Sequence, residues 1–398
     1  MSGIVIIGGG QAAASVAAKA RALGYAGDVT ILGEEAIAPY QRPPLSKAYL
    51  LGDMPLDRLT LRGDDFWAGQ GITLRTGVRV DAIDPALKQV RFGDEVLTYD
   101  DLVLCTGAPP RRLPAAMGGD LAGVYTVRTL ADVDQMKHEF TAGARLVVIG
   151  GGYIGLEAAA VARKLGLEVT LIEAAPRILG RVAAQATADA IRALHQSHDV
   201  TILEGTGIAR LTGEGRVSGV ELADGRAITA DFVIVGIGVL PAVDLAEAAG
   251  IVIENGIAVD DMCRTSAPHI WAAGDCASIM FEGARIRIES VGNAVDMGEL
   301  VAENILGAGK VYAPKAWFWS DQFDTKLQIA GLNIGYDEVV TRDAEGTSIW
   351  YFRNGQLIAV DALNAPRAYM IGKRLIEGGK QITPAQIRET DDLKGLMA

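Results

Sequence analysis

The sequence predicts an α/β fold in which two parallel-sheet domains, one inserted in the other, precede a smaller α+β domain. Two observations support this prediction. An apolar strand-like run, a glycine triplet and an alanine-rich stretch occur together twice, from Ile4 and again from Leu146. After about residue 317 that pattern gives way to aromatic residues and alternating short strands. The chain has 398 residues, which is enough for about two or three domains.

The first copy has a predicted strand at 4–7, a glycine turn at Gly8–Gly10 and a predicted helix over about 11–23. Ala13 stands where a third glycine is common, and Glu34 follows the next strand, 29–32. This order of strand, glycine turn, helix, strand and acidic residue is the dinucleotide-binding fingerprint of Rossmann-like domains. It predicts that the pyrophosphate lies at the helix N-terminus, where free N–H groups point toward it.

The second copy has its strand at 146–149, followed by Gly150, Gly152 and Gly155, and Glu173 closes the next strand. Either turn alone has an alternative interpretation as a tight connection between a strand and a helix. Two copies in full context favour two dinucleotides bound by one chain, an arrangement that usually serves electron transfer between them.

The remaining elements follow in order. Within residues 39–47, the adjacent prolines Pro43 and Pro44 suit a helix entry, where a missing N–H costs little. Short strands over 72–97 and a buried run at 102–105 complete the first part, and a helix at 183–198 continues the second. We expect a hairpin at 223–226, a strand from 232, a strand–Gly–Asp turn ending at Asp275 and a helix over about 293–306. The predicted domains are 1–110 with 236–316, then 111–235, and 317–398.

Charge and composition exclude several function classes. The net charge of −12 argues against nucleic-acid binding, which needs a basic face. No apolar run reaches the roughly 18 residues of a membrane span, and Met1–Gly3 has no basic stretch of a signal peptide, so we expect a cytoplasmic protein. Cys105, Cys263 and Cys276 form no Cys-x-x-Cys pair, so the sequence encodes neither a dithiol nor a zinc site.

Each nucleotide can be assigned to one domain. Asp275 gives the split domain a second carboxylate, which can accept a ribityl hydroxyl, so FAD is expected there. The inserted domain should bind the nicotinamide nucleotide. Glu173 can accept both ribose hydroxyls and would repel a 2′-phosphate, which favours NADH over NADPH; Arg177 is the nearest arginine that could oppose this preference.

Four stretches make a family resemblance specific: RPPLSK at 42–47, GGGYIGLE at 150–157, AAGDC at 272–276 and WFWSDQ at 317–322. With them the chain resembles the FAD-dependent NADH:ferredoxin reductases of bacterial oxygenase systems, whose fold is of the glutathione-reductase type. The resemblance implies that Lys47 lies by the flavin N5 and pairs with Glu157, and that Trp319 packs by the flavin. The alternatives are a surface salt bridge for the pair and an ordinary interdomain aromatic for Trp319.

The cofactor contacts that follow are these. For FAD they are Gly8, Gly10, Ala13, Glu34, Arg42, Lys47, Thr106, Gly107, Asp275, Val291 and Trp319. For NAD they are Gly150, Gly152, Gly155, Glu157, Glu173 and Gly238. Many relatives have Trp-Gln where this chain has Val291-Gly292, so a looser contact is expected there. Lys47, Glu157 and Trp319 are the candidate catalytic residues.

Cysteine usage separates this chain from other flavoproteins that it resembles. Residues 37–47 contain no cysteine, and Cys105 and Cys276 are interpreted as packing residues, so electrons must leave to an external acceptor. The resemblance makes that acceptor a 2Fe–2S ferredoxin serving a cytochrome monooxygenase or a ring-hydroxylating dioxygenase. Candidate docking residues are Arg285, Arg287, Lys326, Lys373 and Arg374.

Three other functions are weighed. A rubredoxin reductase has the same fold and a smaller iron partner. A redox sensor like apoptosis-inducing factor would form a long-lived complex with NAD. An NADH oxidase is disfavoured by the missing cysteine. No metal site is assigned: His195 and His198 lie three apart on a predicted helix, but an exposed helix end is favoured.

Overall fold

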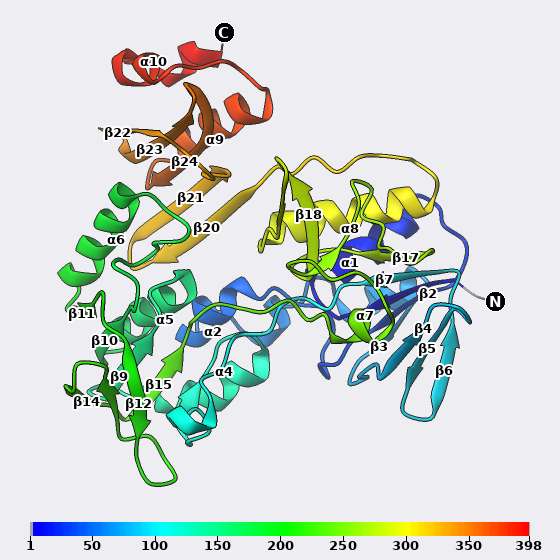
Figure 1. Ribbon diagram of the computed structural model, residues 1–398, viewed down its shortest axis with the longest axis horizontal. Helices are drawn as coiled ribbons and strands as arrows, with labels where there is room; N and C mark the ends of the chain where they lie inside the picture. Colours follow the sequence, from blue (N-terminus) through cyan, green and yellow to red (C-terminus); the bar gives the residue numbers. More distant parts are fainter. Residues whose placement is uncertain (1–2, 398) are drawn as a thin grey trace. The chain divides into compact units, whose positions relative to one another are not determined.

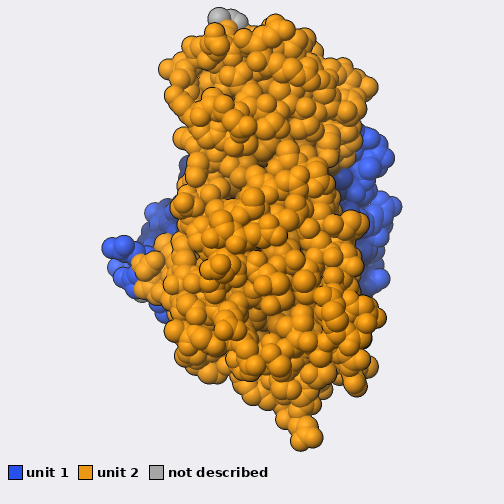
Figure 2. Space-filling view, turned by 90° about the vertical axis from the view of Figure 1, so that its left-hand side faces the viewer, with its two compact units in different colours: residues 1–41, 55–109, 239–316 blue, residues 42–54, 110–238, 317–398 orange. Residues whose placement is uncertain are grey.

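The computed structural model describes residues 3–397 (Figure 1) and contains two compact units (Figure 2). Unit 1 consists of residues 1–41, 55–109 and 239–316, and unit 2 of residues 42–54, 110–238 and 317–398. Each unit contains one copy of the strand–glycine turn–helix repeat. Three chain segments therefore alternate with three others, which is the layout expected when one α/β domain is inserted in another. The predicted α/β class is confirmed.

Unit 1 is built on a parallel sheet with strand order β17-β7-β1-β2-β3. These strands are Ile270–Ala272, Asp101–Leu104, Ile4–Ile7, Val29–Leu32 and Ile72–Arg75. All four residues of the central strand β1 are buried, as expected for a parallel strand covered on both faces. Helices α1 (Gln11–Ala22) and α8 (Val291–Ile305) pack against each other in this unit. Gly298 lets them approach closely, since a Cβ there would lie 2.7 Å from the carbonyl oxygen of Ala12.

Smaller elements complete unit 1. An antiparallel sheet contains β4 (Ala82–Asp84), β5 (Gln89–Phe92) and β6 (Glu95–Thr98). A second small sheet contains β16 (Ile257–Ala258), β18 (Ala277–Phe281) and β19 (Ala284–Ile286). The short helices are α3 (Asp64–Gly69), α7 (Asp244–Ala248) and the 3₁₀ turn η2 (Leu56–Arg58).

Unit 2 repeats the parallel design with strand order β11-β10-β9-β15-β8. These strands are Val200–Leu203, Glu168–Ile172, Arg145–Ile149, Phe232–Val235 and Val124–Tyr125. Helix α5 (Tyr153–Lys164) follows β9, and α6 (Gln185–Ser197) precedes β11. The expected hairpin at 223–226 is present, because β13 (Gly219–Leu222) pairs antiparallel with β14 (Ala227–Thr229) and with β12 (Ile208–Thr212).

Two further parts of the chain belong to unit 2. Residues 42–54 form the 3₁₀ turn η1 (Pro43–Ser46) and the short helix α2 (Ala48–Leu51), with both prolines at the entry of η1. Helix α4 (Leu130–Met136) contacts η1, and further 3₁₀ turns are η3 (Ala115–Met117), η4 (Lys137–Glu139) and η5 (Leu393–Met397).

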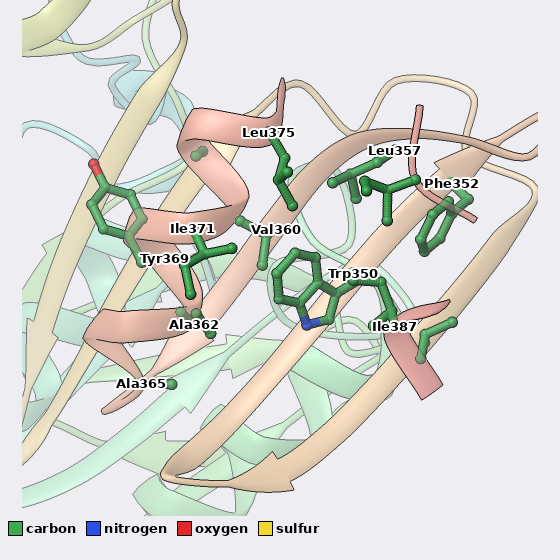
Figure 3. Close-up of a cluster of buried hydrophobic side chains, with 14 residues drawn as sticks. Trp350, Phe352, Leu357, Val360, Ala362, Ala365, Tyr369, Ile371, Leu375 and Ile387 are labelled. Carbon is green, nitrogen blue, oxygen red and sulfur yellow. The ribbon is translucent and has the colours of Figure 1, made fainter. Parts of the chain in front are cut away.

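The C-terminal part of unit 2 is an antiparallel sheet with order β20-β21-β24-β23-β22. Its strands are Trp317–Gln322, Thr325–Gly331, Gln356–Leu363, Gly346–Arg353 and Glu338–Ala344. Helices α9 (Pro366–Glu377) and α10 (Pro384–Glu389) follow. Figure 3 shows the core between sheet and helices, where Trp350 of β23 lies among Val360, Ile371 and Leu375. Strand β20 lies at one edge of this sheet, paired with β21, and it contributes to the site described below.

Candidate functional site

The first glycine turn has a backbone that only glycine accommodates. Gly8 has a φ of +118°, and a Cβ there would lie 2.1 Å from the carbonyl oxygen of Cys105. Gly10 directly precedes α1 as its N-cap residue, no side chain caps the helix, and a Cβ at Gly10 would meet no atom within 4 Å. The first N–H groups of α1 therefore lack a side-chain partner beside open space, which fits a pyrophosphate group. Ala13 is wholly buried on the helix.

The other predicted contacts of unit 1 lie at one edge of its sheet. Gly8, Thr106 and Glu34 follow the carboxyl ends of β1, β7 and β2, and Asp275 follows β17. Because these four strands are parallel neighbours, their ends share the edge at which α/β sheets bind ligands.

Individual positions at this edge differ in what they contact. Glu34 is exposed and pairs with Arg79 at 3.2 Å. Thr106 Oγ1 donates a hydrogen bond to the carbonyl oxygen of Ala242 (2.7 Å), and the Gly107 carbonyl accepts from the Ala242 N–H. Val291 is the first residue of α8, two residues before the predicted start, because the Ser290 side chain caps the helix by accepting from the Asn293 N–H.

The second glycine turn is tighter than the first. Gly150 has a φ of +107°, and a Cβ there would lie 2.3 Å from the carbonyl oxygen of Gly236. A Cβ on Gly155 would lie 2.2 Å from the carbonyl oxygen of Gly150, whereas Gly152 borders open space. Helix α5 begins after Gly152 without a side-chain cap, so this turn also fits a pyrophosphate. Gly238, with a φ of +95°, follows the neighbouring strand β15.

Glu173 has a second task in this turn. Its Oε2 accepts a hydrogen bond from the Gly151 N–H and its Oε1 accepts from the Ala175 N–H, each at 2.7 Å. The carboxylate thus ties the end of β10 to the glycine turn. Each oxygen keeps further lone-pair capacity for a ribose hydroxyl.

An open cleft of about 710 Å³ in unit 2 is lined in part by residues 175–177, which follow β10. Its basic residues already have partners: Arg192 binds Glu204 through two hydrogen bonds of 2.9 Å, and Arg177 donates to the carbonyl oxygen of Ala183 at 2.7 Å. The cleft is lined by Ala175, Pro176, Arg177, Gly180, Gln185, Arg192 and Glu204.

Unit 2 contains a buried ion pair. Lys47 Nζ is 2.8 Å from Glu157 Oε1, and the Glu157 side chain is only 3% exposed. The predicted pairing is therefore present, and the alternative of a surface salt bridge does not hold. Two hydroxyls complete the site: Ser46 donates to Glu157 Oε2 and Ser320 donates to Glu157 Oε1, each at 2.6 Å. A buried carboxylate is stable when a cation and hydrogen-bond donors surround it in this way.

Strand geometry brings Ser320 to this carboxylate. In β20, Ser320 and Gln322 are buried and Asp321 is exposed, because alternate side chains of a strand point to opposite faces. Helix α5 contacts β20 and also contacts η1, so Ser46, Lys47 and Ser320 reach Glu157 from two different segments. Ser46 and Ser320 were not predicted as partners of Glu157, although the alternation within 317–322 would have placed Ser320 and Gln322 on one face.

One prediction about the histidines is wrong. His195 was expected at an exposed helix end, but it is wholly buried. Its Nε2 is 2.7 Å from Gln322 Oε1, and burial lowers its pKa to about 4. The C-terminal sheet covers this face of α6, which the helix sequence alone does not reveal. The His198 ring stacks on the Phe323 ring, with centroids 3.8 Å apart. Within residues 3–397 no three metal-ligating side chains form a group that could hold an ion.

The remaining site candidates lie as follows. Trp319 stacks on Trp317, with ring centroids 5.5 Å apart. Arg42 donates to the carbonyl oxygen of Arg128 at 2.9 Å. Among the docking candidates, Arg285 pairs with Glu254, Arg287 with Glu289 and Lys373 with Glu377. Lys326 lies 3.9 Å from Asp321 but is 57% exposed, and Arg374 is exposed.

The three cysteines are free and buried, as predicted for Cys105 and Cys276. Burial raises the pKa of the Cys105 thiol well above its usual value, so this thiol stays protonated and unreactive. No helix in the described part of the chain is both long and apolar enough to cross a membrane.

The chain is similar to known reductases over almost its whole length. The chain is 42% identical over 403 residues to a ferredoxin–NAD(P)(+) reductase of a Sphingomonas species, covering 99% of this chain and 97% of that protein. It is 36% identical to a rubredoxin–NAD(+) reductase of Pseudomonas putida, with coverage of 92% and 96%. The crystal structure of a covalent putidaredoxin reductase–putidaredoxin complex matches with a TM-score of 0.96 and 38% identity, covering 100% of this chain and 98% of that one.

Two family models also match, the reductase C-terminal domain over residues 317–397 and the pyridine nucleotide-disulphide oxidoreductase domain over residues 2–298. With a glycine turn in each unit and a buried Lys47–Glu157 pair, the chain belongs to the pyridine nucleotide-disulphide oxidoreductase family.

Proposed function

We propose that this chain takes a hydride from NADH onto FAD and passes single electrons to a 2Fe–2S ferredoxin that serves a cytochrome monooxygenase or a ring-hydroxylating dioxygenase. The observation that supports this most is the Lys47–Glu157 ion pair. Glu157 lies two residues beyond Gly155, the last glycine of the second turn. A lysine held in this way supplies a fixed positive charge near a nucleotide-binding helix. When bound, FAD accepts a hydride and returns electrons one at a time.

The residues of the pair have separate tasks in this proposal. Lys47, 15% exposed, is the charge that we place by the flavin N5, and Glu157 keeps it oriented and positions the nicotinamide ring. We assign to Trp319 and Arg42 the flavin contacts that the family resemblance implies. Hydride transfer needs no general base, so no proton acceptor is assigned.

We assign the two nucleotides to separate domains. Residues 1–110 and 236–316 would bind FAD through Gly8, Gly10, Ala13, Glu34, Thr106, Gly107, Asp275 and Val291. Residues 111–235 would bind NADH through Gly150, Gly152, Gly155, Glu173 and Gly238, and residues 317–398 would form the third domain. Glu173 favours NADH over NADPH because its charge would repel a 2′-phosphate. A supply of NADH favours a bacterial cytoplasm as the place of action.

The acceptor is proposed from two lines of support. All three thiols are buried and free, so no surface thiol stands ready to relay electrons. The solved complex with TM-score 0.96 pairs a reductase with putidaredoxin. Lys326 and Arg374 are the docking candidates with exposed charge in unit 2, and an acidic ferredoxin would complement them.

The test is anaerobic stopped-flow reduction of the purified yellow protein with NADH and, separately, NADPH, followed by cytochrome c reduction with a panel of iron–sulfur proteins. We expect fast bleaching by NADH and cytochrome c reduction that depends on a 2Fe–2S ferredoxin. A colourless protein that retains no flavin would refute the proposal.

A rubredoxin reductase is the second candidate, supported by the 36% identity to such an enzyme. The same panel separates the two, because turnover would then depend on rubredoxin rather than on ferredoxin. A long-lived NAD complex without acceptor turnover would instead indicate a redox sensor like apoptosis-inducing factor.

A further inference from the structure

We propose that Ser320, Gln322 and His195 form a one-way hydrogen-bond chain that positions the Glu157 carboxylate against Lys47; this inference rests on the function proposed above. The chain runs from His195 Nε2 to Gln322 Oε1 (2.7 Å), from Gln322 Nε2 to Ser320 Oγ (3.0 Å) and from Ser320 Oγ to Glu157 Oε1 (2.6 Å). These three side chains act on Glu157, so they are positioning residues.

The direction of the chain is fixed at its carboxylate end. Glu157 pairs with Lys47 and is therefore ionised, and an ionised carboxylate can only accept hydrogen bonds. Ser320 must donate its single proton to Glu157, so it can only accept from Gln322. The amide nitrogen of Gln322 then faces Ser320, and its oxygen faces His195.

The same reasoning fixes the tautomer of His195. Because Gln322 presents its oxygen, His195 Nε2 must carry a proton. The other ring nitrogen, Nδ1, is buried without a hydrogen-bond partner. A neutral imidazole carries one proton, so the chain selects the Nε2–H form over the Nδ1–H form.

Burial keeps the chain intact. His195 and Ser320 are wholly buried and Gln322 is 1% exposed, so water does not offer competing partners. Phe323 packs edge-on against the His195 ring, with centroids 5.0 Å apart, and the His198 ring stacks on Phe323. Burial, together with His198, lowers the pKa of His195 to about 4, so the ring stays neutral at physiological pH.

The chain acts on only one side of the carboxylate. Ser46 and Lys47, both from residues 42–54, hold Glu157 from one segment, and Ser320 holds it from the C-terminal sheet. Without Ser320, Oε1 keeps Lys47 alone and the carboxylate can rotate. Each link further from Glu157 should matter less, because its loss leaves the Ser320 bond in place.

The experiment measures the rate at which NADH reduces the flavin in four variants and one control. Ser320→Ala should lower the limiting rate of flavin reduction about tenfold, Gln322→Met about threefold and His195→Phe about twofold, as expected for one charge-assisted hydrogen bond and progressively indirect losses. Ser320→Thr restores the hydroxyl and should recover most of the rate. The matched control is Ser348→Ala, which removes a buried serine of the same sheet whose hydroxyl accepts from Trp350 Nε1.

A spectroscopic readout separates positioning from folding. The readout is the NMR spectrum of holoenzyme labelled with ¹⁵N-histidine, which contains signals from four histidines. The His195 signal is assigned as the one that disappears in His195→Phe. The wild type should show the Nε2–H tautomer. In Ser320→Ala the Gln322 amide is free to turn over, so the Nδ1–H tautomer should become populated.

The outcomes distinguish this inference from the proposed function. A Nδ1–H tautomer in the wild type, or equal rates for Ser320→Ala and Ser348→Ala, would overturn the chain while NADH reduction of the wild type still stood. If the wild type were not reduced by NADH, the proposed function would fall, and the tautomer spectra would still decide whether the hydrogen-bond chain exists.

Discussion

Units 1 and 2 each contain a parallel sheet with a glycine turn after its central strand, yet they differ in the side chains that they bury. Among the side chains that the structure describes, the buried acids and histidine are Glu157, His195 and Asp361, and all three belong to unit 2. The buried polar side chains of unit 1 are the neutral Ser278, Asn293 and Asn304. The buried polar side chains described in unit 1 are thus uncharged, whereas unit 2 holds ionisable side chains where α5 and α6 meet the C-terminal sheet.

The two buried carboxylates described in unit 2 are stabilised in different ways. Glu157 has a cation and two hydroxyl donors. Asp361 has only hydroxyl donors, Thr187 at 2.7 Å and Tyr351, and its Oδ1 has no partner. Burial therefore raises the pKa of Asp361 to about 6. A buried carboxylate without a cation is partly neutralised by holding its proton.

The largest difference between the units is expected at the third position of the glycine fingerprint. Gly155→Ala would place a Cβ 2.2 Å from a backbone carbonyl that cannot rotate away, so we expect a loss of about 3 kcal/mol in the free energy of unfolding and weaker NADH binding. Ala13→Gly, at the matching position of unit 1, should cost about 1 kcal/mol from helix propensity. Thermal unfolding and NADH titration test this; equal losses would show that both turns pack alike.

Acid should reveal two opposing contributions in unit 2. The pKa of His195 falls to about 4 in the folded chain, from about 6.5 when unfolded, so its contribution is complete above pH 6.5 and is lost as the pH falls through 4. Asp361 has a raised pKa, so its contribution is complete below about pH 3.9 and is lost as the pH rises through 6. Each amounts to about 3 kcal/mol, from about 1.4 kcal/mol per pKa unit.

Because the two windows overlap between about pH 4 and 6, the contributions nearly cancel in the wild type. Between pH 7 and pH 4.5, His195→Phe should gain stability relative to the wild type and Asp361→Asn should lose it, by about 2 kcal/mol each. Urea unfolding followed by tryptophan fluorescence measures the differences. Parallel pH curves for the wild type and both variants would contradict the assigned burial.

A smaller effect is expected where unit 1 has its own close approach. In Gly298→Ala the new Cβ would lie 2.7 Å from the carbonyl oxygen of Ala12 and 3.0 Å from Ser15 Cβ, so α8 must move away from α1. We expect a loss of about 2 kcal/mol and weaker flavin retention. Gly69→Ala is the matched control, because a Cβ there meets nothing within 4 Å and better helix propensity should stabilise by about 0.5 kcal/mol. If both substitutions stabilise, the helix contact is looser than described.

Local patterns explain what the sequence revealed. The strands and helices around both glycine turns follow from β-branched runs, positive-φ glycines and alanine-rich helices, all within about thirty residues. Partners far apart in the chain were harder to predict. The Lys47–Glu157 pair came from a family resemblance, and Ser320, 163 residues from Glu157, was not found. The prediction that His195 is exposed was wrong because the sequence of an amphipathic helix does not tell which other element will cover it.

The smallest expected difference concerns the acidic residue after each second strand. Glu173 bonds two backbone N–H groups of its unit, whereas Glu34 is exposed and pairs with an exposed Arg79. Glu173→Gln turns an amide N–H toward one of those donors, so we expect a loss of about 1 kcal/mol; Glu34→Gln should change stability by less than about 0.5 kcal/mol.

The nucleotide preference sharpens this last contrast. Glu173→Gln removes the charge that opposes a 2′-phosphate, so the KM for NADPH should fall while the KM for NADH rises. Glu34→Gln leaves unit 2 unchanged, so it should alter neither KM and should instead weaken flavin retention. Steady-state kinetics with both nucleotides, together with flavin release on dilution, measure the two effects. A change in nucleotide preference in Glu34→Gln would mean that the cofactors are assigned to the wrong units.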